Sequence, residues 1–251
     1  MERMDADLRR ARDLITGASR ITALTGAGIS TDSGIPDFRG PNGLWTRDPE
    51  AEKLSNLQDY RDSADVRRRA WQARLEHPAW QATPNPAHDA FVALQHGGTL
   101  TAIITQNIDE LHQRAGSAPE TVIELHGTMF HTECLECGDR RDMAEALDRV
   151  RAGADDPPCT ACGGILKSAT ISFGQALDAD VLDRARVAAI SCDVLVTAGT
   201  SLTVHPAAGL VDVAAGTGAS VIVCNASPTP YDERADVVLR EPLAEVLPRL
   251  T

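Results

Sequence analysis

The chain of 251 residues is long enough to bury a sizeable core, and its 43% hydrophobic and 24% charged residues are typical of a folded domain rather than a disordered chain. Its formal net charge of −12 argues against a nucleic-acid binder that relies on a broad basic surface, and favours cationic partners such as lysine-rich peptides. No apolar stretch is long enough to span a membrane, and the charged first residues lack the apolar centre of a signal peptide. We therefore expect a cytoplasmic protein that binds neither nucleic acid nor membrane.

Residues 5–18 carry apolar side chains at helical spacing, which predicts an amphipathic helix. A short apolar strand then leads into a glycine-rich stretch over residues 23–40, ALTGAGISTDSGIPDFRG. Gly26 and Gly28 fit a turn that brings the backbone close to a phosphate, because glycine tolerates close approach and positive φ. Thr31 replaces the third glycine of the dinucleotide-binding pattern, so this stretch taken alone also fits an ordinary strand-to-helix turn.

Residues 41–85 differ in composition from the stretch before them: they are rich in charge and end among prolines. This predicts a small helical insert whose charges form a solvated face. Its modest core would come from the large apolar residues Leu44, Trp45, Leu54, Leu57, Trp71, Leu75 and Trp80. A further helix is predicted over residues 88–95.

Four later runs are short and apolar, which is typical of strands buried on both faces of a parallel sheet. They cover Leu100–Thr105, Thr121–Leu125, Asp193–Ala198 and Ser220–Cys224, with a crossover helix expected at about 207–215. Polar residues end four of the predicted strands: GAGIS, QNID, GTS at 199–201, and Asn225. Because the carboxyl ends of parallel strands meet at one edge, these four tips predict a ligand site in an α/β fold.

Four of the six cysteines form two C-x-x-C pairs, and a glycine follows each pair. They are Cys134, Cys137, Cys159 and Cys162. Four thiolates can surround one Zn²⁺ tetrahedrally and leave no coordination position for water, which predicts a structural ion rather than a catalytic one. Four unligated buried thiols are the weaker alternative. The other two cysteines lie in apolar runs, so the whole set suits a reducing compartment better than a disulfide framework.

Six elements in this order resemble the sirtuins. They are GAGIS..SGIPDFRG, TQNID.LH, an isolated HG, the paired C-x-x-C knuckles, GTSL.V.PA and a final strand that ends in Asn. The match covers nearly the whole chain, which is identified as a single-module member of the bacterial type. The resemblance implies an NAD-dependent protein-lysine deacetylase or deacylase, which transfers the acyl group to ADP-ribose and releases nicotinamide. It also implies NAD as co-substrate, one structural Zn²⁺, and acyl-lysine proteins or peptides as partners, and leaves the oligomeric state open.

The resemblance also implies an architecture. A Rossmann-like, doubly wound parallel sheet would form the NAD-binding domain from residues 1–40, 86–128 and 168–251. A smaller domain would consist of the helical insert, 41–85, and a zinc-ribbon insert, 129–167. In sirtuins the cofactor and the acyl-lysine enter the cleft between two such domains.

Three residues are predicted to be catalytic from the sirtuin motifs. His126 matches the HG histidine that activates a ribose hydroxyl, and a histidine with an ordinary pKa of about 6.5 can accept a proton at cellular pH. Asn107 and Asp109 match the QNID pair that orders the nicotinamide pocket. The alternative for this pair is capping of the helix that follows.

The predicted cofactor-binding residues lie at the strand tips and in the loop after the first strand. They are Gly26, Ala27, Gly28, Ser30, Ile35, Asp37, Phe38, Arg39, Gln106, Asn107, Asp109, Gly199, Thr200, Ser201, Asn225 and Leu243. Phe38 would shield the reactive ribose from water, and Arg39 would bind phosphate.

The segment ISFG at 171–174 resembles the sirtuin segment on which a substrate peptide adds as a strand. The resemblance predicts that Ile171, Phe173 and Gly174 bind substrate. The alternative is that ISFG is simply a strand between the zinc module and the last helices.

The chain departs from common sirtuin patterns at a few positions. Gly40 stands where many sirtuins have Ser, and Gln175 where many have Glu. Trp71 and Arg74 fall where sirtuins that prefer succinyl-lysine carry Tyr-x-x-Arg, and the missing phenol favours acetyl or another neutral acyl group. The alternative there is a core Trp71 beside a solvated Arg74.

Two other functions stay open on the sequence. A protein mono-ADP-ribosyltransferase would trap the same ribose cation with a protein nucleophile. A non-catalytic NAD-binding zinc module is disfavoured because His126, Asn107 and Asp109 occur together. A dehydrogenase is disfavoured by the altered glycine pattern.

Overall fold

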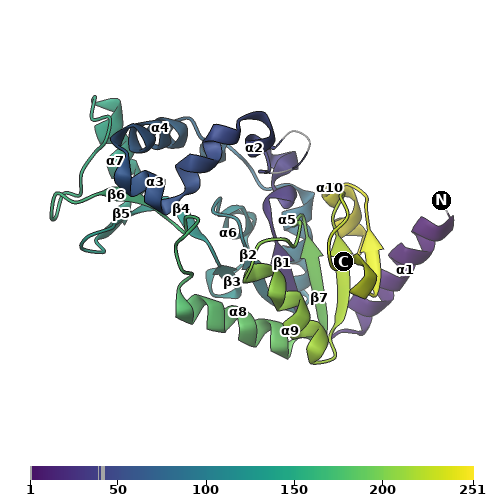
Figure 1. Cartoon of the computed structure of the whole chain (residues 1–251). Coiled ribbons are helices and arrows are strands. Elements are labelled where there is room, and N and C mark those ends of the chain that lie inside the picture. The colour runs from purple at the N-terminus through teal and green to yellow at the C-terminus, as the bar shows by residue number, and fades with distance from the viewer. Residues whose placement is uncertain (1, 39, 41–42) are drawn as a thin grey trace. The chain divides into compact units, whose positions relative to one another are not determined.

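The structure is a computed structural model that describes residues 2–38, 40 and 43–251 (Figure 1). The chain divides into two compact units. Unit 1 comprises Met1–Ile35, Ala82–Leu125 and Asp178–Thr251, and unit 2 comprises Pro36–Gln81 and His126–Leu177. Among the described residues, no helix combines the length and the apolar character needed to cross a membrane.

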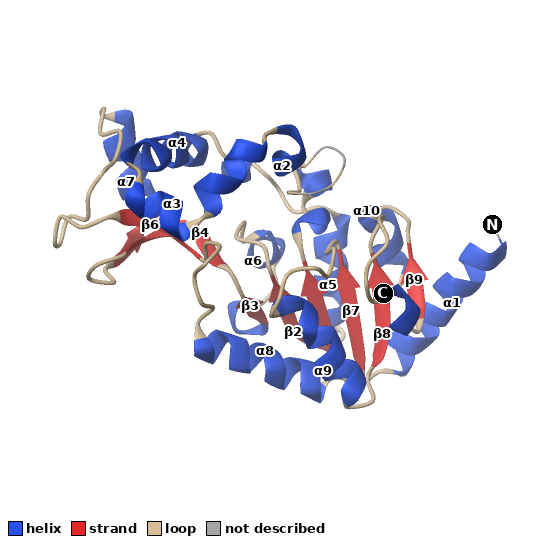
Figure 2. Ribbon diagram, in the orientation of Figure 1, coloured by secondary structure: helices blue, strands red, loops and turns tan. Residues whose placement is uncertain are grey.

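Six parallel strands form the sheet of unit 1, in the order β3-β2-β1-β7-β8-β9 (Figure 2). The strands are β1 Ile21–Thr25, β2 Leu100–Thr105, β3 Val122–Glu124, β7 Val194–Ala198, β8 Ser220–Cys224 and β9 Val237–Leu239. Within this unit the order is that of a Rossmann sheet, with the third strand at one edge and the sixth at the other. The predicted Rossmann-like parallel sheet is therefore confirmed.

Helices cover both faces of this sheet. They are α1 Glu2–Gly17, α5 Pro86–His96, α6 Leu111–Ala115, α8 Ala179–Ser191, α9 Leu210–Gly216 and α10 Leu243–Val246. Residues of α1, α5 and α10 share one core with the strands, in which Ile15, Phe91 and Val246 are buried. On the other face α8 packs against α9, and Thr22 Oγ1 donates to Ala188 O of α8 at 3.1 Å. The helices predicted over 5–18 and 88–95 are α1 and α5.

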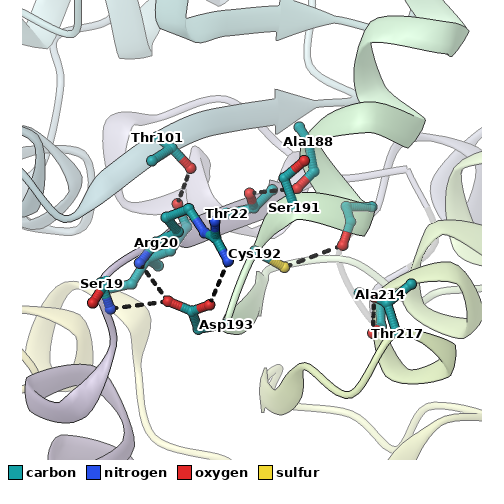
Figure 3. Close-up of polar contacts among 12 residues, drawn as sticks. Ser19, Arg20, Thr22, Thr101, Ala188, Ser191, Cys192, Asp193, Ala214 and Thr217 are labelled. Carbon is teal, nitrogen blue, oxygen red and sulfur yellow. Dashed lines mark hydrogen bonds and ion pairs between the residues drawn. The ribbon is translucent and has the colours of Figure 1, made fainter.

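Asp193 fastens the turn between α1 and β1 at the amino ends of the strands (Figure 3). Its carboxylate accepts the N–H of Ser19 at 3.0 Å and that of Arg20 at 2.9 Å, and it pairs with the Arg20 guanidinium at 3.0 Å. The hydrogen bond from the Arg20 side chain holds the pKa of Asp193 below its usual range. A shallow depression lined by residues such as Thr101 and Arg184 lies at this end, opposite the strand tips that carry the predicted site.

Unit 2 holds a three-stranded antiparallel sheet with the order β5-β4-β6. Its elements are α2 Leu44–Arg47, α3 Leu57–Asp62, α4 Ala64–Leu75, β4 Gly127–Cys134, β5 Arg140–Asp142, α7 Met143–Arg151 and β6 Leu166–Thr170. Short 3₁₀ helices complete the two units: η1 Ala27–Ile29, η2 Thr31–Ser33, η3 Pro49–Ser55, η4 Pro78–Trp80, η5 Pro119–Thr121, η6 Ala207–Gly209, η7 Asp232–Arg234 and η8 Leu247–Arg249.

The helical insert and the zinc insert share one core within unit 2. Trp71 of α4 is fully buried and packs with Met143 and Leu147 of α7 and with two of the paired cysteines. The prediction of Trp71 as a core residue is confirmed. Leu44, which was predicted in this core, is 38% exposed, because the short helix α2 carries it outside the cluster.

The alternative of a solvated Arg74 beside Trp71 does not hold in the structure. Its guanidinium donates to Ala70 O at 3.1 Å and to Ser168 Oγ at 2.6 Å. It also lies 5.7 Å from the ring centroid of Trp71 and 5.9 Å from that of Tyr60. Burial between these groups lowers the pKa of Arg74.

Candidate functional site

The tips of β1 and β7 meet where the strand order of the unit 1 sheet reverses. Gly26 N–H donates to Ala198 O at 3.1 Å, and Gly28 N–H donates to Gly199 O at 2.8 Å. A Cβ on Gly28 would lie 2.8 Å from Gly199 Cα, and one on Gly199 would lie 2.3 Å from Ile29 N. These glycines are therefore required by the packing of the two tips, a reason that the sequence analysis did not consider. A crevice outside the strand ends at this reversal is the usual ligand position of such sheets.

Ser30 brings together the two predicted catalytic residues of unit 1. Its hydroxyl donates to Asp109 Oδ2 at 2.7 Å and accepts from Asn107 Nδ2 at 3.1 Å. All three side chains are buried, and burial raises the pKa of Asp109, which the hydrogen bonds partly offset. Asp109 Oδ1 also accepts the N–H of Leu111 at the start of α6, so Asp109 makes the capping contact and Asn107 does not.

Gln106 connects three strand tips. Its side-chain Nε2 donates to Thr200 Oγ1 at 2.9 Å and to Thr25 O at 3.3 Å, and its backbone N–H donates to Thr25 O at 3.0 Å. The predicted residues Gln106 and Thr200 thus lie in contact, and they fix the ends of β1, β2 and β7 in one arrangement.

A buried row of polar groups beneath these tips was missed by the sequence analysis. Thr25 Oγ1 donates to Thr105 Oγ1 at 2.9 Å, and Thr105 Oγ1 also accepts the N–H of Asn107 at 3.1 Å. Because the Thr25 proton is used, the 3.0 Å contact with His112 requires that His112 Nε2 carries a proton and donates it. Burial holds the pKa of His112 well below its usual value, so its other nitrogen is bare. The signal was available, since His112 is the last residue of TQNID.LH.

His88 continues this row. Its Nδ1 accepts the N–H of Asn85 at 3.3 Å, so its Nε2 carries the proton. The rings of His88 and His112 lie edge to face with centroids 5.0 Å apart. His88 Nε2 and His112 Nδ1 are a donor and an acceptor, and neither has a hydrogen-bond partner among the described residues. Asn85 in turn donates to Ile29 O at 2.8 Å and to Ser33 Oγ at 2.9 Å, which ties the start of α5 to the glycine-rich segment.

The remaining predicted residues of unit 1 lie farther along its edge. Asn225 follows β8, donates from Nδ2 to Ser227 O at 2.8 Å, and its carbonyl accepts from Arg240 Nη1 at 2.7 Å. Leu243 is 8% exposed and packs in the core of unit 1. Ile35 is equally buried, whereas Ser201 is exposed and Ala27 is half-buried.

The loop residues Asp37 and Phe38 belong to unit 2, and Arg39 lies outside the described residues. The carbonyls of Asp37 and Phe38 accept from the first two backbone N–H groups of α2, at 2.8 and 3.0 Å. Asp37 Oδ1 also accepts the N–H of Gly40 at 2.9 Å, and a Cβ on Gly40 would lie 2.2 Å from Asp37 Oδ2. A Ser at this position, as in many sirtuins, would therefore require the Asp37 carboxylate to move.

His126 stands directly before β4 in unit 2 and is half-buried. Its carbonyl accepts the N–H of Ile171 at 2.9 Å, which joins the HG segment to the ISFG segment. Gly127 has φ +69°, and a Cβ there would lie 2.2 Å from Ala169 O. The positive φ and the lack of room for a Cβ both require glycine at position 127, directly after His126.

The ISFG segment pairs with the helical insert. Phe173 N–H donates to Ser55 O at 2.7 Å, and Phe173 O accepts the N–H of Leu57 at 3.0 Å. Both backbone groups of Phe173 are therefore used inside unit 2, and the residue is 37% exposed. The Trp45 ring lies between those of Phe173 and Phe38, with centroid distances of 5.5 and 4.7 Å. Gly174 has φ +83° and ends the extended segment.

The four paired cysteines form a metal centre in unit 2. Their sulfur atoms all lie within 4.8 Å of one another, with 3.5 Å between Cys134 and Cys162 and 3.8 Å between Cys137 and Cys159. Four sulfurs at about 2.3 Å from one tetrahedral Zn²⁺ are about 3.8 Å apart, so these residues fit the ion. The two knuckles have the same turn, in which the N–H of Gly138 or Gly163 donates to the carbonyl of the first cysteine of its pair, at 3.0 and 2.9 Å. The predicted structural zinc site is confirmed.

Comparison with known proteins identifies the family. A model described as the Sir2 family matches residues 26–206, which is more than half of the chain. The chain belongs to the Sir2 family. This confirms the resemblance to sirtuins that the motifs predicted.

Two relatives show how closely the chain follows other members of the Sir2 family. The NAD-dependent protein deacetylase 2 of Streptomyces coelicolor is 52% identical over 236 residues, which cover 94% of this chain and 98% of that protein. The NAD-dependent protein deacylase 2 of Archaeoglobus fulgidus is 38% identical over 249 residues, which cover 98% of this chain and 96% of that protein.

Solved Sir2 structures have the same fold. One that addresses the mechanism and regulation of Sir2 enzymes matches with a TM-score of 0.89 at 38% identity, covering 98% of this chain and 97% of that one. A complex of Sir2 with a p53 peptide and NAD⁺ matches with a TM-score of 0.87 at 31% identity, covering 97% and 96%. A complex with a propionylated peptide matches with a TM-score of 0.86 at 30% identity, with the same coverage.

Proposed function

We propose that this Sir2-family chain is an NAD-dependent protein-lysine deacetylase or deacylase. It transfers the acyl group of an acyl-lysine to ADP-ribose and releases nicotinamide. The observation that carries the proposal is the buried group of Ser30, Asn107 and Asp109 at the strand tips of a Rossmann sheet. It supports an enzyme over a passive cofactor-binding module, because burying a carboxylate and an amide costs free energy that a binding tip alone does not require. The relatives named as NAD-dependent deacetylases support the same reaction.

In unit 1, we assign the cofactor to the strand tips. Bound NAD supplies a nicotinamide–ribose bond that can be broken. Asp109 can accept from a carboxamide N–H, and Asn107 can both donate and accept, so the pair can orient such a group. The polar tips are held by hydrogen bonds from Ser30 to Asp109 and from Gln106 to Thr200, which favours a single binding geometry. Ser201 and Asn225 are assigned to the adenosine side, with Gly26, Ala27 and Gly28 near the pyrophosphate.

In unit 2, we assign the base to His126 and the peptide to the ISFG segment. A neutral imidazole accepts a proton from a hydroxyl at cellular pH, which is the role of a general base. The ring of Phe38 is exposed and fits the role of excluding water from the reacting centre. Ile171, Phe173 and Gly174 would hold the acyl-lysine peptide, Phe173 through its exposed ring because its backbone groups are already paired.

We further propose a neutral acyl group, such as acetyl or propionyl, as the preferred substrate. Recognition of succinyl by Arg74 would need a guanidinium that faces the acyl group, and Arg74 already donates to Ala70 O and Ser168 Oγ. A cytoplasmic location is proposed because four thiolates that hold zinc require a reducing compartment.

The test is incubation of the purified protein with NAD and matched peptides bearing acetyl-, propionyl- or succinyl-lysine. We expect loss of the acyl group with equal amounts of nicotinamide and acyl-ADP-ribose by mass spectrometry, with acetyl and propionyl faster than succinyl. Labelled ADP-ribose transferred to protein, with the acyl-lysine left intact, would instead identify a mono-ADP-ribosyltransferase and overturn the proposal.

A further inference from the structure

Lys167 in β6 of unit 2 is buried, with only 1% of its surface exposed. Lysine is almost never fully buried unless its charge has partners. The ammonium Nζ donates to Ser168 O at 3.0 Å and to Thr170 O. Both acceptors are carbonyls of its own strand, and among the described residues no carboxylate is ion-paired with it.

The pairing between β6 and β4 explains why these carbonyls need a donor. The two strands pair regularly from Cys134 to Thr132, opposite Leu166 to Ser168, and the next pair is Gly127 with Thr170. Between the last two pairs β6 advances by two residues while β4 advances by five, so the regular ladder is interrupted there. A buried carbonyl without a donor costs free energy, and the Lys167 ammonium supplies the N–H groups at the interruption.

A second cation holds the same stretch of strand. Arg74 Nη2 donates to Ser168 Oγ at 2.6 Å, and Ser168 Oγ lies 2.8 Å from Thr170 Oγ1. The hydroxyl of Tyr60 donates to Leu166 O at 2.8 Å. Burial and the Arg74 charge lower the pKa of Lys167 to about 8, with Glu133 acting in the opposite direction. Lys167 and Arg74 therefore hold the same stretch of β6 although their charges repel each other.

The interrupted stretch leads directly into the segments that the proposed reaction uses. Thr170, whose carbonyl Lys167 binds, pairs with Gly127 of the HG segment. The next residue, Ile171, donates its N–H to His126 O. Lys167 therefore binds the carbonyl of Thr170, the residue directly before the ISFG segment and opposite Gly127 of the HG segment.

We propose that Lys167 is a positioning residue for the acyl-lysine substrate. Together with Arg74, its ammonium group holds the interrupted end of β6 so that Ile171, Phe173 and Gly174 keep the conformation that receives the peptide. This inference rests on the proposed role of the ISFG segment.

The test compares Lys167→Met, which keeps the length of the side chain and removes the donors, with Lys167→Arg, which keeps donors and charge. We expect the methionine variant to raise KM for an acetyl-lysine peptide by about tenfold, the effect of losing one hydrogen bond to a charged group, while kcat and KM for NAD change less than about twofold. The arginine variant should restore most of the peptide KM. Hydrogen exchange at the Ile171 amide should accelerate in the methionine variant.

Lys53→Met is the matched control, because Lys53 is an exposed lysine of the same unit, and its exchange pattern should equal that of the wild type. Unchanged exchange and unchanged peptide KM in Lys167→Met would overturn the proposal. So would a fall in kcat alone, which is what a loss of folded enzyme produces. If the methionine variant does not fold, Lys167→Gln, which keeps an amide donor without the charge, takes its place. If the wild type has no deacylase activity, the proposed function fails, and the exchange measurement still decides whether Lys167 holds the strand.

Discussion

Gly28 and Gly199 contact each other through their backbones, and neither position has room for a side chain. The Gly28 N–H donates to Gly199 O at 2.8 Å, and Gly199 has φ +65°. The tips of β1 and β7 are thereby held at a separation that a larger residue would increase. Gly28 belongs to the incomplete dinucleotide-binding pattern of residues 26–31. Its glycine is required by the packing of the β1 tip against the β7 tip.

Gly199→Ala should unfold the tip of β7 or force it away from β1. The added Cβ would overlap Ile29 N, and φ is positive, so we expect a loss of roughly 2 to 4 kcal/mol in the free energy of unfolding. Urea unfolding measures it. Gly216→Ala is the control, because a Cβ there meets nothing within 4 Å, and its stability should equal or exceed that of the wild type. Equal stability of the two variants would contradict the packing argument.

Removal of zinc should unfold the zinc insert of unit 2. Cys134 and Cys159 are part of the core shared by α4 and α7, so loss of the metal should expose that core. A strong chelator or Cys137→Ser should abolish bound zinc in elemental analysis and accelerate hydrogen exchange in α7. Cys192→Ser is the control, because Cys192 lies in unit 1, and this variant should bind as much zinc as the wild type. A metal-free protein with protected α7 amides would show that the site is dispensable.

His126→Ala should abolish turnover while the protein still folds and binds NAD. Loss of a general base costs about 10²- to 10⁴-fold in rate. Kinetics with an acetyl-lysine peptide and calorimetric titration with NAD separate the two effects. His131→Ala serves as the control, because His131 is an exposed histidine of the same region, in β4. Near-normal turnover of His126→Ala would remove His126 from the mechanism.

Stability should fall between pH 6.5 and pH 4 because of His88. Burial lowers the pKa of His88 from 6.5 to about 4, so the unfolded chain binds a proton in this range and the folded chain does not. The contribution of His88 to the free energy of unfolding is fully present above pH 6.5 and is lost as the pH falls towards 4. The loss amounts to about 1 to 3 kcal/mol. Urea midpoints from pH 7.5 to 4.5 measure the slope. His88→Gln keeps an acceptor for the Asn85 N–H and should reduce the slope, whereas the exposed His96→Gln should leave it unchanged. The remaining slope belongs to other buried histidines such as His112, whose pKa burial also lowers. A slope in His88→Gln equal to that of the wild type would contradict the assignment to His88.

The sequence was sufficient to predict that the polar strand tips gather in one place, because the carboxyl ends of parallel strands lie at one edge of the sheet. GAGIS, QNID, GTS and Asn225 follow β1, β2, β7 and β8, which are neighbours in the sheet. The zinc ligands were equally predictable, since two C-x-x-C pairs have few other uses. The roles of the individual site residues stay predictions.

Other features depended on contacts that no local pattern contains. The strand β5 consists of the exposed residues Arg140, Arg141 and Asp142, so it has no apolar signal, and β9 is only three residues long. For Arg74 the sequence left acyl recognition and a solvated side chain open, and its position between Tyr60 and Trp71 arises only when α3 and α4 pack together. The buried row through His88 and His112 was missed because histidine has no characteristic periodicity.

The burial of Lys167 limits where the chain itself can be acylated on lysine. The chain has 24 arginine and lysine residues, but only Lys53 and Lys167 are lysines. Since the amine of Lys167 is enclosed and bonded to two carbonyls, Lys53 is the one lysine that an acyl phosphate or thioester can reach in the folded chain. Acylation of the lysine side chains of the folded chain is therefore confined to Lys53.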